Sequence, residues 1–130
     1  MRAFVINGPR DARVADVPPP TAGRGQVVVD VERVGVCGTD VELFDGTMPY
    51  LLEGHEKYPL RPGHEWSATV STIGADVEEH WLGARVTGDT MLGCGNCPRC
   101  RRGHHHVCVD RYEIGIRGGP ARVSATGMPV

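Results

Sequence analysis

The 130-residue chain has few aromatic residues (5 %), and its 14 basic and 16 acidic residues leave a net charge of only −2. This balance provides no basic surface for nucleic acid and no polybasic patch for a membrane. No apolar stretch approaches the roughly 20 residues needed to cross a bilayer. The first residues, from Met1 to Phe4, do not resemble a secretory signal. We therefore expect no nucleic-acid partner, no membrane partner, and a location in the reducing cytoplasm.

The chain also lacks the glycine-rich fingerprint of dinucleotide-binding domains, because no Gly-x-Gly-x-x-Gly occurs in it. Its 18 glycines and 10 prolines favour short strands and many turns over a helical bundle. At 130 residues the chain is long enough for one domain with a core of its own.

Local patterns predict a mainly β fold. The strongest pattern alternates Val27, Val29 and Val31 with neighbours that include charged residues. A short helix is predicted over 39–44, capped by Thr39 or Asp40. The predicted strands are 2–6, 12–17, 26–36, 66–73 and 84–87.

Four of the five cysteines form a Cys-x2-Cys-x2-Cys-x7-Cys run: Cys94, Cys97, Cys100 and Cys108. Four thiolates in a tight loop suit a closed, tetrahedral structural zinc site. Neighbouring cysteines at x2 spacing suit disulfides poorly. Bacterial ferredoxins share the first three cysteines, but their fourth follows after three residues and precedes proline. Zinc is therefore the favoured interpretation, with an iron–sulfur cluster and redox or unligated thiols as alternatives. Three adjacent histidines at 104–106 are expected to point to solvent.

Two further clusters lie at the edges of predicted strands. Cys37 is framed by Gly35 and Gly38, and His64 follows Gly63. Taken alone, Cys37 fits a buried small hydrophobe and His64 a structural histidine. Taken together, with an acidic residue nearby, they have the ligand types of a catalytic zinc site.

These motifs, in this order, resemble the N-terminal, GroES-like catalytic domain of zinc-dependent medium-chain alcohol dehydrogenases. The resemblance rests on 35–40, 63–65 and 94–108 and runs to about residue 119. The bacterial polyol, glucose and threonine dehydrogenases are the more similar branches. The resemblance implies a partly open β-barrel with short helices and a zinc-binding loop lobe at 93–109.

The resemblance also implies the role of each site residue. Cys37 and His64 would bind the catalytic zinc, with Glu65 beside the metal as an alternating or more distant ligand. Thr39 would take the proton of the substrate alcohol into a relay, and Asp40 would orient His64. The four cysteines of the lobe would bind the structural zinc. A small alcohol, polyol or sugar would be the substrate.

In the family this domain is followed by a third zinc ligand and a Rossmann domain for NAD or NADP, neither of which is recognisable here. Residues 120–130 contain no acidic residue, no aromatic residue and no alternation. We therefore expect a reading frame that is truncated or shifted near Gly119, with a non-native tail. The expected function is that of a dehydrogenase catalytic domain that is inactive on its own. Its oligomeric state stays open. The alternative is a stand-alone, zinc-stabilised binding module without redox activity.

Overall fold

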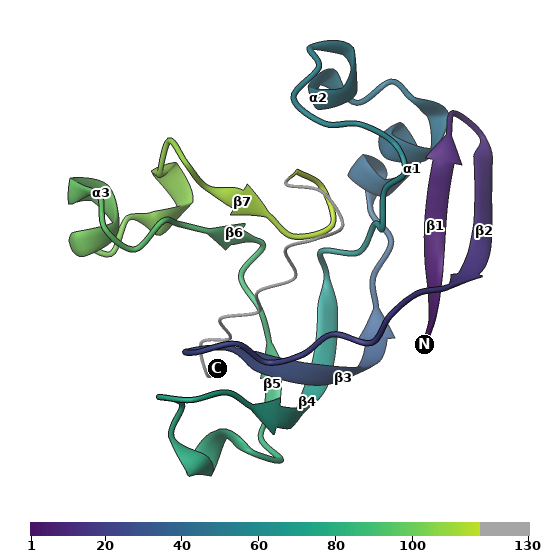
Figure 1. Cartoon of the computed structure of the whole chain (residues 1–130). Coiled ribbons are helices and arrows are strands. Elements are labelled where there is room, and N and C mark those ends of the chain that lie inside the picture. Colours follow the sequence, from purple (N-terminus) through teal and green to yellow (C-terminus); the bar gives the residue numbers. More distant parts are fainter. Residues whose placement is uncertain (118–130) are drawn as a thin grey trace.

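The computed structural model describes residues 1–117, which form three small antiparallel sheets joined by short helices (Figure 1). The β1–β2 hairpin lies at one side of the molecule, and a lobe carrying β6 and β7 projects at the other. The middle sheet has the order β3-β4-β5. The strands are β1 (Arg2–Gly8), β2 (Asp11–Asp16), β3 (Val27–Val34), β4 (Trp66–Ile73), β5 (Arg85–Thr87), β6 (Met91–Leu92) and β7 (Tyr112–Glu113).

The helices are short and lie between the strands. The longest, α1 (Gly38–Asp45), follows β3, and α2 (Pro49–Leu52) comes directly after it. A helix α3 (Pro98–Arg101) and a 3-10 turn η2 (His105–Val107) lie in the lobe, and η1 (Glu79–Trp81) precedes β5. Within the described part of the chain, no helix has the length and apolarity to span a membrane.

Two separate hydrophobic clusters hold the described residues together. In the first, Leu43 of α1 packs against Ile6 of β1 and Leu60. The backbones of Ile6 and Leu60 also exchange hydrogen bonds of 2.9 and 2.8 Å, which fixes the segment before β4 onto the hairpin. In the second cluster, Ala68 and Val70 lie two residues apart and share one face of β4, so both side chains are buried.

The mainly β class is confirmed, and the middle strands form where the alternating valines predict them. β3 ends at Val34 rather than at residue 36. The prediction that Thr39 or Asp40 caps α1 is wrong, because the cap is Cys37. The short elements β6, β7, α2 and α3 were not predicted, since two to four residues carry no period to detect. The expected non-native tail lies outside the described residues.

Candidate metal centres

The four lobe cysteines converge from both ends of the lobe. All four sulfur atoms lie within 4.8 Å of one another. The sulfurs of Cys97 and Cys108 are 3.8 Å apart. Four sulfurs placed at about 2.3 Å from a central zinc in a tetrahedron are separated by about 3.8 Å, so the observed spacing fits zinc. All five cysteines are free thiols in the described residues.

Backbone amides of the lobe point at these sulfurs. The N–H of Cys97 donates to Cys94 at 3.4 Å, and that of Cys100 donates to Cys97 at 3.4 Å. The N–H groups of Asn96 and Cys97 lower the pKa of Cys94. The N–H of Cys100 lowers the pKa of Cys97 to about 7, whereas burial raises the pKa of Cys100 to about 11. Donors aimed at sulfur stabilise thiolate, which is the form that binds metal.

Gly93 makes the tight packing of the lobe possible. A Cβ atom at Gly93 would lie 2.6 Å from the sulfur of Cys100 and 2.9 Å from the Cβ of His105. The three adjacent histidines are only partly as predicted, because His105 contacts Asp89 at 2.8 Å, with 25 % of its side chain exposed. That hydrogen bond is the main cause of a lowered pKa of Asp89.

The second candidate centre joins the start of α1 to the segment before β4. The sulfur of Cys37 lies 3.1 Å from Nε2 of His64, across 27 residues of sequence. Cys37 takes this position because it caps α1: its sulfur accepts the N–H of Thr39 at 3.3 Å. The cap therefore aims one potential ligand at the other.

Asp40 completes this group from the opposite side of the imidazole. Its Oδ2 accepts the N–H of Cys37 at 3.0 Å, and its Oδ1 faces Nδ1 of His64 at 3.5 Å. Both side chains are nearly buried, with 11 % and 9 % exposed. Oδ1 and Nδ1 have no hydrogen-bond partner within residues 1–117. A carboxylate behind a histidine fixes the ring so that the other nitrogen is free for a metal. A ring held in this way fits a zinc site.

Glu65 and Thr39, the other two residues singled out from the sequence, lie near this group but outside it. Glu65 is exposed and its carboxylate lies against Gly35, where a Cβ atom would come within 2.6 Å of its Oε2. Among the described residues, the group that could hold a metal here consists of Cys37, Asp40 and His64, without Glu65. Thr39 is the second residue of α1 and contributes its backbone N–H to Cys37.

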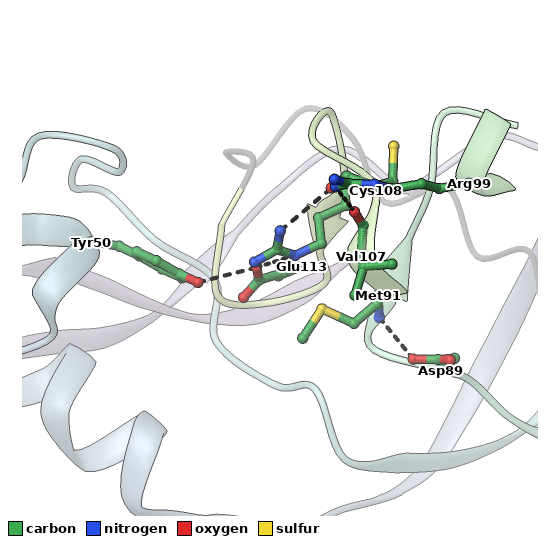
Figure 2. A network of polar contacts seen from close by, with 8 residues as sticks. Tyr50, Asp89, Met91, Arg99, Val107, Cys108 and Glu113 are labelled. Atoms are coloured by element: carbon green, nitrogen blue, oxygen red, sulfur yellow. Dashed lines mark hydrogen bonds and ion pairs between the residues drawn. The ribbon is translucent and has the colours of Figure 1, made fainter. Parts of the chain in front are cut away.

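A buried carboxylate that the sequence did not suggest ties the lobe to α2. Glu113 of β7 is only 4 % exposed and accepts hydrogen bonds from Arg111 (2.9 Å) and from the hydroxyl of Tyr50 (3.2 Å). Figure 2 shows the hydroxyl of Tyr50 pointing toward Glu113, with the hydrogen bond as a dashed line. The guanidinium of Arg117 lies 5.4 Å above the ring of Tyr50. No periodic pattern surrounds Glu113, so only the structure reveals it.

The family model for the alcohol dehydrogenase GroES-like domain matches residues 23–127. The chain belongs to this family. L-threonine 3-dehydrogenase of Streptomyces coelicolor is 36 % identical to this GroES-like domain over 118 residues, which are 89 % of the chain and 33 % of that enzyme. The threonine dehydrogenase branch inferred from the sequence is thus among its relatives.

Solved structures of dehydrogenases are similar to this GroES-like domain. A putative zinc-binding dehydrogenase from Sinorhizobium meliloti, bound to NADP, has a TM-score of 0.76 at 31 % identity and is matched over 99 % of this chain and 38 % of its own. Galactitol-1-phosphate dehydrogenase from Escherichia coli has a TM-score of 0.77 at 27 % identity, over 100 % and 38 %. The chain spans about a third of the length of the curated relatives it matches.

Proposed function

We propose that this chain is the metal-binding, catalytic part of a zinc-dependent dehydrogenase that oxidises a small alcohol, polyol or sugar. The observation that carries the proposal is the contact of 3.1 Å between Cys37 and His64, with Asp40 behind the imidazole. These are ligand types of a catalytic zinc site. The family membership and the NADP-bound S. meliloti relative support the same chemistry.

In this proposal, Cys37 and His64 hold the catalytic metal and the chain's other residues position them. Zinc in such a site lowers the pKa of a bound alcohol and stabilises the alkoxide. The carboxylate of Asp40, 3.5 Å from Nδ1 of His64, would accept a hydrogen bond from Nδ1–H and keep Nε2 facing Cys37. The Thr39 hydroxyl would accept the proton of the alcohol while passing its own proton into a relay. Glu65, at the exposed side of the site, would approach the metal as an alternating or more distant ligand. NAD or NADP, bound by a separate nucleotide-binding domain, would accept the hydride.

The four lobe cysteines hold a structural zinc in this proposal, which fits their spacing and the amides directed at them. Four thiolates leave no open position, so this metal takes no part in the reaction. Thiolates of this kind persist in a reducing compartment, and the cytoplasm is the proposed location.

Metal counting tests the proposal. We expect the wild-type chain, purified with zinc and assayed by atomic emission, to bind two zinc ions. The double substitution Cys37→Ala and His64→Ala is expected to bind one, and Cys97→Ser is expected to lose the lobe zinc. The wild-type chain fused to the nucleotide-binding domain of a threonine or polyol dehydrogenase is expected to oxidise alcohols with NAD(P). The same fusion carrying Cys37→Ala and His64→Ala is expected to be inactive.

A second candidate is a stand-alone, zinc-stabilised binding module, which the self-contained lobe favours because its four ligands need no other domain. One zinc in the wild type, unchanged by Cys37→Ala and His64→Ala, together with inactive fusions, would establish the module instead. Visible absorbance from iron would exclude both.

A further inference from the structure

The backbone at His64 is held by the segment that enters the four-cysteine lobe. The hydroxyl of Thr90 donates to the carbonyl oxygen of His64 at 3.2 Å. The carbonyl of Thr90 in turn accepts the N–H of Ile114 at 3.0 Å. Thr90 therefore connects the strand leading into the lobe, the segment leaving it, and the histidine of the other metal centre.

The segment leaving the lobe meets the same place from its other side. A Cβ atom at Gly115 would lie 2.4 Å from the carbonyl oxygen and 2.7 Å from the nitrogen of Gly63. Both glycines have positive φ, at 68° and 123°. The two backbones thus pack directly on each other, one residue before His64, in a way that no side chain at position 115 would permit.

These contacts lie at the base of the lobe. Thr90 immediately precedes β6, which leads to Cys94. Gly115 comes two residues after β7, which follows Cys108. When the lobe is ordered around its four cysteines, β6 and β7 pair, with Met91 opposite Glu113, and this pairing sets the positions of Thr90 and Gly115.

The backbone of Glu65, the residue after His64, is also held by a hydrogen bond on the side facing Cys37. The carbonyl of Glu65 accepts the N–H of Gly35 at 2.7 Å. The ring of His64 faces the carboxylate of Asp40 at 3.5 Å, and the backbone around His64 is held by hydrogen bonds with Gly35 on one side and Thr90 on the other. A ligand held within about 0.5 Å of its productive place binds metal better than one that must first be ordered.

We propose that Thr90 and Gly115 are positioning residues for His64, through which an ordered four-cysteine lobe supports metal binding at Cys37 and His64. This inference rests on the proposed function, because it takes His64 as a metal ligand. The base of the lobe then has a role besides stability: it presents the histidine.

Cobalt binding tests the inference on the chain itself. The lobe is first filled with one equivalent of zinc, and Co²⁺ is then titrated while the thiolate charge-transfer and d–d bands are recorded. Thr90→Val is expected to weaken Co²⁺ binding by about tenfold or more, the low end of the effect of groups that hold a metal ligand in place. Thr90→Ser keeps the hydroxyl and is expected to restore wild-type affinity.

Thr87 provides a matched control, because its hydroxyl also donates to a backbone carbonyl, that of Trp66, at 2.6 Å. Thr87→Val is expected to leave Co²⁺ affinity unchanged. The ¹³C shift of the His64 carbonyl, selectively labelled in metal-free protein, is expected to change in Thr90→Val and not in Thr87→Val. Gly115→Ala is expected to weaken Co²⁺ binding from the exit side of the lobe.

The outcomes separate the two proposals. If wild type and the double variant Cys37→Ala and His64→Ala give the same cobalt spectrum, neither residue is a ligand, and both the proposed function and this inference are overturned. If wild type binds Co²⁺ at Cys37 and Thr90→Val binds equally well with an unchanged carbonyl shift, only the inference is overturned. Loss of the lobe zinc in Thr90→Val would assign Thr90 to lobe stability and would also overturn it.

Discussion

Asp40 makes two contacts with one carboxylate, and each serves a different purpose. One oxygen completes the cap of α1 through the N–H of Cys37, and the other faces the ring of His64. The residue thereby fixes both proposed ligands relative to each other. A single acidic residue three positions after the cap is also the pattern of a capping box. The capping-box pattern is therefore present in the sequence. It does not suggest Cys37 as the cap, because cysteine is not among the residues usually expected at that position.

We expect Asp40→Asn to weaken metal binding at Cys37 and His64 by about 10–100-fold, because an amide of the same shape can keep the cap but loses the charge facing the imidazole. Competition titration with a zinc indicator would measure the loss. Asp45→Asn is the control, since Asp45 lies in the same helix and pairs with Arg10 instead. Equal losses in both variants would contradict a specific role for Asp40.

Glu113 is the buried charge whose removal we expect to be felt most in stability. Glu113→Gln would leave Arg111 and Tyr50 with a weaker acceptor, and hydrogen bonds to charged groups contribute about 1.5–3 kcal/mol each. We expect urea unfolding to show a loss of about 1–3 kcal/mol. Glu78→Gln is the control, because that carboxylate is 80 % exposed. A wild-type midpoint for Glu113→Gln would show that the network contributes nothing.

At the scale of elements, the sequence predicted the long strands and the two groups of potential ligands that the structure brings together, but not how the elements meet. The run of valines predicts β3 correctly, but burial does not alternate along the strand: Val27 and Val29 pack against the second cluster, whereas Val31 is 53 % exposed. The cysteine spacing indicates the lobe because the chain must fold back on itself to bring the four sulfurs within 4.8 Å of one another. The contacts of Thr90, Gly115 and Glu113 depend on residues far apart in sequence, so no local pattern could predict them.

The lobe as an element should bind zinc in a pH-dependent way. Cys97, with its pKa lowered to about 7, is already thiolate above that pH, whereas Cys100, with its pKa raised to about 11, must release a proton on binding. We expect zinc affinity to fall as the pH drops below about 11, because Cys100 must release its proton, and to fall more steeply below about 7, where protons also compete for Cys97. Calorimetry in buffers of different ionisation enthalpy would measure the released protons.

The matching variant is Cys100→Ser, which removes the thiol that stays protonated. Its zinc binding should be weaker and should release fewer protons at pH 8 than that of the wild type. A proton release that is zero in the wild type at this pH would contradict the raised pKa of Cys100.

At the scale of the whole molecule, the described residues depend on two small clusters rather than one large core. We expect Leu43→Ala to cost about 2–5 kcal/mol, because the leucine is fully buried between α1 and the β1–β2 hairpin. That is a large share of the 5–15 kcal/mol typical of a domain. Urea unfolding of the zinc-loaded chain would measure it.

Leu52→Ala makes the same chemical change at a side chain that is 73 % exposed, and we expect it to leave the unfolding midpoint nearly unchanged. Similar losses for Leu43→Ala and Leu52→Ala would show that the first cluster is not the stabilising core that its burial indicates.

Cys37 belongs to the helix that packs in the first cluster, whereas His64 leads directly into the strand of the second. A metal-mediated link between Cys37 and His64 would close a loop across 27 residues and reduce the conformational entropy of the denatured chain. A permanent cross-link over such a loop would be worth about 3.5 kcal/mol. An ion held there would link the two clusters, so removing it with a chelator would also lower the stability of the fold.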